Sequence, residues 1–181
     1  MEAQEKFVVV VFPNGLQGKI WSTILRSQNL SVIWESPDVP LSHTLKILNQ
    51  RGSLPDLLVI DTRLHHLQPF HLCRWCQQSC PGIKILLING AQSRILAAER
   101  QWAMTQGAVD LLPRINQDTL ISSAAANLRK TLDLMDILHY DQKTFITALL
   151  KMGLYVQPRS SSVHKHIKLY MDSRQSTSSK G

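Results

Sequence analysis

A single carboxylate at the end of an apolar run is the residue of this chain best placed to do chemistry. Residues 57–60 read Leu-Leu-Val-Ile and lead directly to Asp61. A continuous apolar run of this kind predicts a strand that is buried on both faces in a parallel sheet. Open α/β sheets bind their ligands at the carboxyl ends of such strands. Asp61 is therefore a candidate site residue.

A second group of residues has metal-ligand spacing. Three cysteines lie on one predicted helix, at Cys73, Cys76 and Cys80, and His65, His66 and His71 precede them. Thiolates and imidazoles bind zinc or iron–sulfur clusters. The same spacing also defines one face of a helix, and cysteine is readily buried. We interpret the cysteines as a buried helix face, so we expect no metal site. Their odd number argues against a disulfide framework.

The elements that would position these residues follow from the spacing of apolar side chains. Five apolar runs predict strands at residues 7–12, 30–34, 57–61, 83–89 and 108–112. Helical spacing and helix-ending signals predict helices at residues 16–28, 40–50, 69–78 and 93–106, and another from about residue 117. Strict alternation predicts an α/β fold with a doubly wound five-stranded parallel sheet. The expected strand order is the flavodoxin-like 2-1-3-4-5.

Two amphipathic helices are predicted after the fifth strand. In the first, Ile121, Ala125, Leu128, Leu132 and Met135 are spaced 4-3-4-3, as in a coiled coil. Asp141 can cap the second, whose apolar stripe comprises Phe145, Ile146, Leu149 and Leu150. Either these helices fold back on the sheet domain, or they form a dimer or partner surface. The candidate interaction surface comprises Ile121, Leu128, Leu132, Met135, Phe145 and Leu149.

Composition divides the chain into three parts. We expect a sheet domain over residues 1–131, a helical extension over 132–157 and a disordered, basic, Ser-rich tail over 158–181. The whole chain has 20 basic and 13 acidic side chains, for a net charge of +7. From Gln157 onward the count is five basic against one acidic. Such an end can meet an acidic partner, nucleic acid or a membrane surface, or remain solvated.

Several classes of protein are disfavoured by what the sequence lacks. No secretory signal and no apolar run long enough to span a membrane is present, so we expect a cytoplasmic protein without membrane attachment. The chain has no Gly-rich phosphate loop and no nucleophile elbow. We therefore expect no enzymatic activity, no catalytic residue and no cofactor.

The segment PDLLVIDTRL, residues 55–64, resembles the third strand of response-regulator receiver domains, and the resemblance extends over residues 6–130. In that family an aspartate accepts a phosphoryl group, and the matching residue is Asp61. The family also has an acidic pair after strand one that helps to hold Mg²⁺, and this pair falls at Phe12-Pro13. The threonine or serine ending strand four falls at Asn89, and the lysine ending strand five falls at Arg114.

These departures predict a degenerate receiver. Magnesium needs octahedral oxygen ligands, and Phe12 and Pro13 supply no ligating side chain. Phosphoryl transfer depends on the charge neutralisation that Mg²⁺ provides. We therefore interpret Asp61 as a phosphoacceptor-like residue without Mg²⁺-dependent phosphorylation. Asn89 and Arg114 complete a phosphate-pocket-like site, in which we expect Asp61 and Arg114 to form an ion pair.

Two functions from different classes follow from this sequence. The first is a pseudo-receiver in a signalling pathway of two-component type, acting through a protein partner or as a homodimer. Its expected binding face is formed by residues 93–135. The alternative is a transcriptional regulator whose basic C-terminal segment binds DNA. The run from Ser160 to Met171 resembles the recognition helix of response-regulator helix-turn-helix domains.

Overall fold

A computed structural model describes residues 6–154 of the chain and confirms the predicted sheet. Five parallel strands form a single sheet in the order β2-β1-β3-β4-β5. The strands are β1 (Phe7–Val11), β2 (Ser31–Glu35), β3 (Leu57–Asp61), β4 (Lys84–Asn89) and β5 (Asp110–Pro113). The predicted C-terminal tail and its helix-turn-helix-like run lie outside the described residues, and the proposed division into domains stays a prediction.

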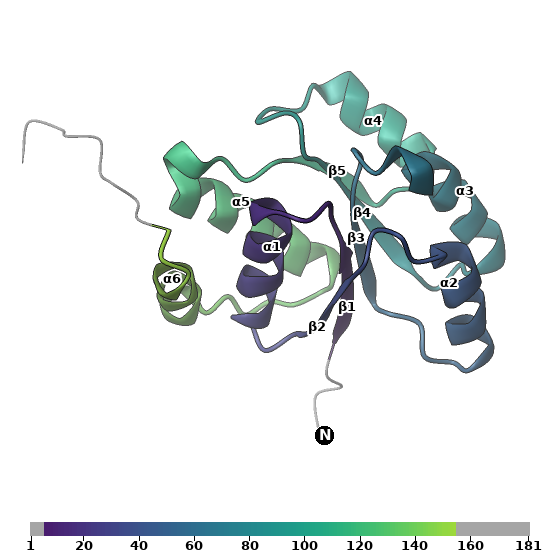
Figure 1. The fold of residues 1–181 in the computed structure, drawn as a ribbon, viewed down its shortest axis with the longest axis horizontal. Helices are drawn as coiled ribbons and strands as arrows, with labels where there is room; N and C mark the ends of the chain where they lie inside the picture. The colour runs from purple at the N-terminus through teal and green to yellow at the C-terminus, as the bar shows by residue number, and fades with distance from the viewer. Residues whose placement is uncertain (1–5, 155–181) are drawn as a thin grey trace, which may run out of the picture.

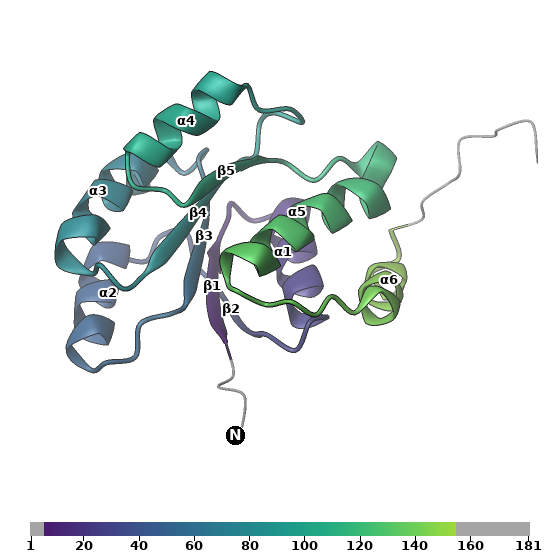
Figure 2. The same ribbon diagram turned by 180° about the vertical axis from the view of Figure 1, so that it is seen from behind.

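Helices cover both faces of the sheet (Figure 1). On one face lie α2 (Leu41–Gln50), α3 (Pro69–Ser79) and α4 (Ala97–Thr105). On the other lie α1 (Leu16–Arg26) and α5 (Leu120–Leu134), with α6 (Gln142–Lys151) packed outside them, as the reverse view in Figure 2 also shows. Two short 3₁₀ turns, at His65–Leu67 and Gln117–Thr119, precede α3 and α5. The result is three layers with an added helix on one side.

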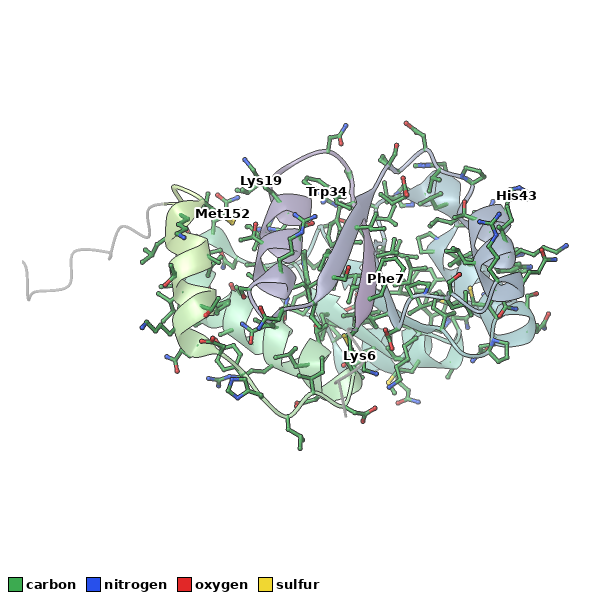
Figure 3. All side chains as sticks on the ribbon, turned by 90° about the horizontal axis from the view of Figure 1, so that it is seen from below. Lys6, Phe7, Lys19, Trp34, His43 and Met152 are labelled. Carbon is green, nitrogen blue, oxygen red and sulfur yellow. The ribbon has the colours of Figure 1, made fainter. Side chains whose placement is uncertain are left out.

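The central strands are apolar because both of their faces are covered. In β3, Leu57 and Val59 enter the core under α1 and α5, while Leu58 and Ile60 enter the core under α2, α3 and α4. All five residues of β3 are fully buried, including Asp61. Figure 3 shows the side chains that fill these two cores on either side of the sheet. The burial of β3 on both faces is what brings the Asp61 carboxylate into the interior.

Helix α4 begins later than the sequence predicted. Its first helical residue is Ala97, whereas apolar spacing suggested a start near residue 93. The Glu99 carboxylate accepts a hydrogen bond from the backbone N–H of Leu96 at 2.8 Å, which satisfies a donor at the helix start. Residues 91–96 therefore remain a loop at the carboxyl end of β4. This loop adjoins the site around Asp61.

Helix α5 ends close to the predicted boundary of the sheet domain, and Leu128, Leu132 and Met135 of its 4-3-4-3 seam pack in the core of that domain. The last helical residue is Leu134, and Asp136 has a left-handed φ of 58°. The ammonium of Lys84 donates to the carbonyl of Leu134 at 2.6 Å and lies 3.2 Å from the Asp136 carboxylate. A cation at a helix C-terminus satisfies a carbonyl that has no partner within the helix.

The predicted interaction surface is also corrected, because most of its residues are in the core. Five of the six residues are buried to 2% exposure or less, namely Leu128, Leu132, Met135, Phe145 and Leu149. All five belong to one cluster with α1 and strands β1 and β3. Of the six, only Ile121 is exposed, at 37%. The two appended helices thus fold back, which was one of the two open interpretations.

Polar contacts hold α6 against α1. The side-chain amide of Gln28 donates to the backbone carbonyl of Asp141 at 3.1 Å and accepts from its backbone N–H at 2.8 Å. The Asp141 carboxylate caps α6, as the sequence predicted, by accepting from the backbone N–H of Thr144 at 2.9 Å. The side-chain hydrogen bond from Thr144 lowers the pKa of Asp141. These bonds fix the entry of α6 next to the end of α1.

The packing of α6 can be tested with two adjacent leucines. Leu149 is 2% exposed and Leu150 is 63% exposed. We expect Leu149→Ala to lower the free energy of unfolding by about 2–5 kcal/mol, because it leaves a cavity in the core. The control Leu150→Ala should change it by no more than about 0.5 kcal/mol. Urea denaturation followed by circular dichroism measures both, and equal effects would contradict the docking of α6.

Candidate functional site

The Asp61 carboxylate is closed off by the arginine two residues later. The Arg63 Nη2 atom lies 2.6 Å from Asp61 Oδ2, and Arg63 Nε lies 3.0 and 3.1 Å from the two oxygens. The backbone N–H of Arg63 also donates to Oδ1 at 2.9 Å. Both carboxylate oxygens therefore have charged hydrogen-bond donors. The pair is strong because one partner is fully buried and the contact is forked.

The environment of this ion pair is asymmetric. Asp61 is 0% exposed on its side chain, whereas Arg63 is 42% exposed. The hydrogen bond to Asp61 raises the pKa of the Arg63 guanidinium above its usual value. Arg63 thus remains a permanent cation at the mouth of the site. A buried carboxylate is stable here because that cation and a backbone N–H both compensate its charge.

Gly90 provides the space in which this pair forms. A Cβ atom at position 90 would collide with the Arg63 Nε atom and with the Oδ2 atom of Asp61. Both contacts would involve the ion pair itself, so a side chain at position 90 would displace Arg63 from the carboxylate. Gly90 follows Asn89, the last residue of β4, and β4 pairs with β3 in the sheet.

The positions expected for an acidic pair after β1 hold Phe12 and Pro13, and Phe12 joins a group of aromatic side chains. Phe12 is fully buried and its ring stacks on that of Trp21, with centroids 6.3 Å apart. Trp34 from β2 packs close to Gly18 of α1, and Figure 3 shows it on the α1 side of the sheet. The carboxyl end of β1 is therefore apolar. Phe12 and Pro13 offer no side-chain oxygen to Asp61.

The remaining residues of the predicted phosphate pocket do not contact Asp61. The Oδ1 atom of Asn89 accepts a hydrogen bond from the backbone N–H of Ala91 at 3.1 Å. Arg114 is exposed, and its backbone N–H donates to the carbonyls of Asn89 and Gln92 at 3.2 and 2.9 Å. Asn89 and Arg114 thus share a backbone contact. Neither one compensates the charge of Asp61.

The predicted Asp61–Arg114 ion pair is wrong. Among residues 6–154, the basic side chain that pairs with Asp61 is Arg63. Arg63 is two residues from Asp61 in the same turn, whereas Arg114 would have to reach across β4. Sequence reasoning overlooked Arg63, although its spacing from Asp61 was the available signal. A basic residue placed just after a buried strand-end carboxylate can fold back on it without a long-range contact.

The cysteines are buried in the core between the sheet and α2, α3 and α4, as their helical spacing predicted. Cys73, Cys76 and Cys80 are all buried with free thiols. Burial raises the pKa of Cys73 and that of Cys76 to about 12, and it also raises the pKa of Cys80. The thiols therefore stay protonated at neutral pH. Within residues 6–154, no three histidine, cysteine or acidic side chains cluster in a way that could hold a metal ion.

Ile121 lies beside a shallow hollow on the outer face of α5. The hollow has a volume of about 510 Å³, and its lining includes Thr119, Ala125 and Arg129. It is part of the face formed by residues 93–135 that the sequence suggested for partner binding.

Within the described part of the chain, no helix is both long and apolar enough to cross a membrane.

Solved structures with the same fold are receiver domains. A response regulator receiver protein from Burkholderia phymatum is 18% identical, covers 74% of this chain and 97% of its own, and has a TM-score of 0.54. The signal receiver domain of the putative response regulator NarL from Mycobacterium tuberculosis is 18% identical, with coverages of 74% and 98% and a TM-score of 0.55. The chain therefore has the receiver-domain fold.

A third structure with this fold comes from an unusual regulator. It is an atypical orphan response regulator described as having a phosphorylation-independent regulatory mechanism. It is 13% identical, covers 75% of this chain and 99% of its own, and has a TM-score of 0.53. No protein-family model and no curated protein matches the sequence.

The contribution of Arg63 can be measured by removing it. We expect Arg63→Ala to lower the free energy of unfolding by about 1.5–3 kcal/mol, because the buried Asp61 carboxylate loses its charged donors. Adding Asp61→Asn to that variant should recover part of the loss, since the unpaired charge is gone. Arg51→Ala, at an exposed position in the turn after α2, is the control. Urea titration measures all four proteins, and equal effects of the two arginine changes would refute the ion pair's role.

Proposed function

We propose that this protein is a non-catalytic signalling protein of two-component type that acts through protein–protein interaction. Its receiver-like domain works without Mg²⁺-dependent phosphorylation of Asp61. The observation that carries this proposal is the forked ion pair between Arg63 and the fully buried Asp61. Both oxygens of the carboxylate that would accept a phosphoryl group are hydrogen-bonded to a cation of the chain itself.

The residues around Asp61 do not fit a magnesium ion. Mg²⁺ requires octahedral oxygen ligands and usually one or two carboxylates. The positions after β1 where a receiver has its acidic pair are Phe12 and Pro13, and Phe12 is buried against Trp21, so neither supplies a second carboxylate beside Asp61. Arg63 places a positive charge against the same oxygens, so a divalent cation would have to displace it. No step of the proposed function therefore passes through Mg²⁺.

Permanent neutralisation by Arg63 has a consequence for signalling. In a phosphorylated regulator, the charge at the acceptor aspartate changes with the signal. In this chain the guanidinium balances Asp61 at every physiological pH, because its pKa is raised further by that same contact. Regulation would then come from the abundance of the protein or from its partners. The phosphorylation-independent mechanism described for the orphan regulator of similar fold supports this proposal.

The partner surface that we propose is the outer face of α5 around Ile121. Ile121 is 37% exposed, and Arg129 lines the same hollow. An exposed aliphatic side chain next to a cation suits a partner with an apolar anchor and a neighbouring acidic group. A second copy of this chain remains one form that such a partner can take.

The first test concerns phosphorylation. We expect purified full-length protein incubated with acetyl phosphate and Mg²⁺ to gain no phosphoryl group by intact-mass spectrometry, because Asp61 is paired with Arg63 and the described residues around it do not fit Mg²⁺. Asp61→Asn serves as the unreactive reference, and an active receiver domain in the same reaction serves as the positive control. A Mg²⁺-dependent phosphoryl adduct that is lost in Asp61→Asn would overturn the pseudo-receiver assignment.

The second test concerns the partner. We expect affinity purification from the source cells to recover the same proteins with the wild-type chain and with Asp61→Asn, because binding does not depend on the acceptor. Ile121→Asp should lose them, and the exposed control Leu150→Asp should retain them. Quantitative mass spectrometry compares the four baits. Loss with Asp61→Asn, or retention with Ile121→Asp, contradicts the proposed mode of action.

A further inference from the structure

A groove between α3 and α4 opens at the carboxyl ends of β3 and β4. It has a volume of about 880 Å³, and its lining runs from Arg63 and Asn89 at the strand ends to Arg74 and Trp102 on the helices. Figures 1 and 2 both show α3 and α4 side by side on the same face of the sheet. Cavities of about 300–1,000 Å³ are the usual size for small-molecule sites. We call this cavity the α3–α4 groove.

One wall of the α3–α4 groove is aromatic. The rings of Phe70 and Trp102 meet edge to face, with centroids 4.5 Å apart and an angle of 60°. Trp102 is nevertheless 51% exposed, which leaves part of its indole ring uncovered. Both residues line the groove. A planar ring bound there would remove this apolar surface from water and gain aromatic contact.

The groove also carries hydrogen-bond donors with positive charge. Arg74 donates to the neutral side chain of Gln106 and, within residues 6–154, forms no ion pair. Arg63 uses Nε and Nη2 on Asp61, so its Nη1 group remains available to a ligand. The one acidic residue of the lining, Glu99, is hydrogen-bonded to the start of α4. These donors favour a ligand with a carboxylate or phosphate.

Two contacts across the groove decide what size of ligand fits. The Phe70–Trp102 contact and the Arg74–Gln106 hydrogen bond each join α3 to α4. Because these side chains hold α3 and α4 together at two points, the groove leaves less room for a peptide helix than for a compact ligand. A compact ligand can enter from the strand ends, where Arg63 and Asn89 border the opening. The dimensions and the donors therefore favour a small molecule.

We propose that the α3–α4 groove binds a small organic anion with a planar aromatic ring. The ring packs against Trp102 and Phe70, and its carboxylate or phosphate accepts hydrogen bonds from Arg74 and Arg63. This site takes a different class of ligand from the protein partner at α5, and it does not depend on the signalling role. Because Arg63 also holds Asp61, the bound anion contacts the same guanidinium as that carboxylate.

The probes separate the two parts of this ligand. Isothermal titration calorimetry with the full chain uses AMP as a ring with a phosphate and indole-3-acetate as a ring with a carboxylate. Adenosine supplies a ring without charge, and inorganic phosphate supplies the charge without a ring. We expect AMP or indole-3-acetate to bind with a Kd of about 1 mM or tighter. Adenosine and phosphate alone should bind at least about tenfold more weakly, since each makes half of the contacts.

Variants then assign the binding to the groove. Trp102→Ala and Arg74→Ala should each weaken binding of the better probe by about tenfold. Met104→Ala, on the same helix but outside the lining, and Arg51→Ala should leave it unchanged. Ala98→Glu adds a carboxylate to the groove without removing a contact, so it should weaken binding as well. Its position in the first turn of α4 favours an acidic residue, so folding is preserved.

Several results would overturn the proposal. One is that neither aromatic anion binds, and another is that binding is the same in Trp102→Ala, Arg74→Ala and Ala98→Glu as in the wild type. Equal weakening in the Met104→Ala and Arg51→Ala controls would mean that the probes bind elsewhere. Binding of an acidic tryptophan-containing peptide, with no binding of the small anions, would assign the groove to a protein partner instead.

Discussion

The site depends on accommodating one buried carboxylate inside a parallel sheet. Asp61 ends a strand whose residues are all buried, so its charge cannot be solvated by water. An isolated buried charge costs several kcal/mol, and only a close cation or several donors can offset that cost. Arg63 provides both, through a forked contact and a backbone N–H. The contact requires open space at Gly90, because a Cβ there would overlap both partners. This ion pair therefore constrains the chain at the carboxyl ends of both β3 and β4.

The neighbouring carboxyl end of β1 is apolar and, among the described residues, holds no ion pair of this kind. There the chain has Phe12, and its ring lies in a cluster with Trp21 and, through Gly18, beside Trp34. Burying aromatic surface at this point contributes to the same core that receives α5 and α6. An acidic pair in its place would need a cation of its own, whereas the aromatic cluster needs none. The two strand ends thus differ: one carries a compensated charge, and the other carries none. That difference underlies the proposal of a regulator that works without a metal ion.

Helix α6 changes which surfaces are free to bind. Its apolar side chains Phe145 and Leu149 enter the core with Leu132 and Met135, and Gln28 anchors its start. This packing uses apolar surface that an isolated helix would expose, which leaves Ile121 and the outer face of α5 as the candidate contact area. On the opposite face of the sheet, α3 and α4 enclose the groove beside Arg63. The proposed protein partner and the proposed small ligand would therefore occupy separate faces of the molecule.

The sequence by itself determined the architecture, since apolar periodicity is local and each run identifies its own strand or helix. The runs at 57–60 and 83–89 predicted buried strands, the alternation predicted the order 2-1-3-4-5, and the spacing of the cysteines predicted a buried helix face. Phe12 and Pro13 were also visible as a missing acidic pair. The spacing of Arg63 from Asp61 made their pairing possible, but tertiary structure decided that Arg63 rather than Arg114 pairs with Asp61, and that α6 packs inward rather than against a partner. Both outcomes depend on which side chain lies nearest in space and on the room left for it. Residue spacing along the chain encodes neither the space at Gly90 nor the position of α6 against α1.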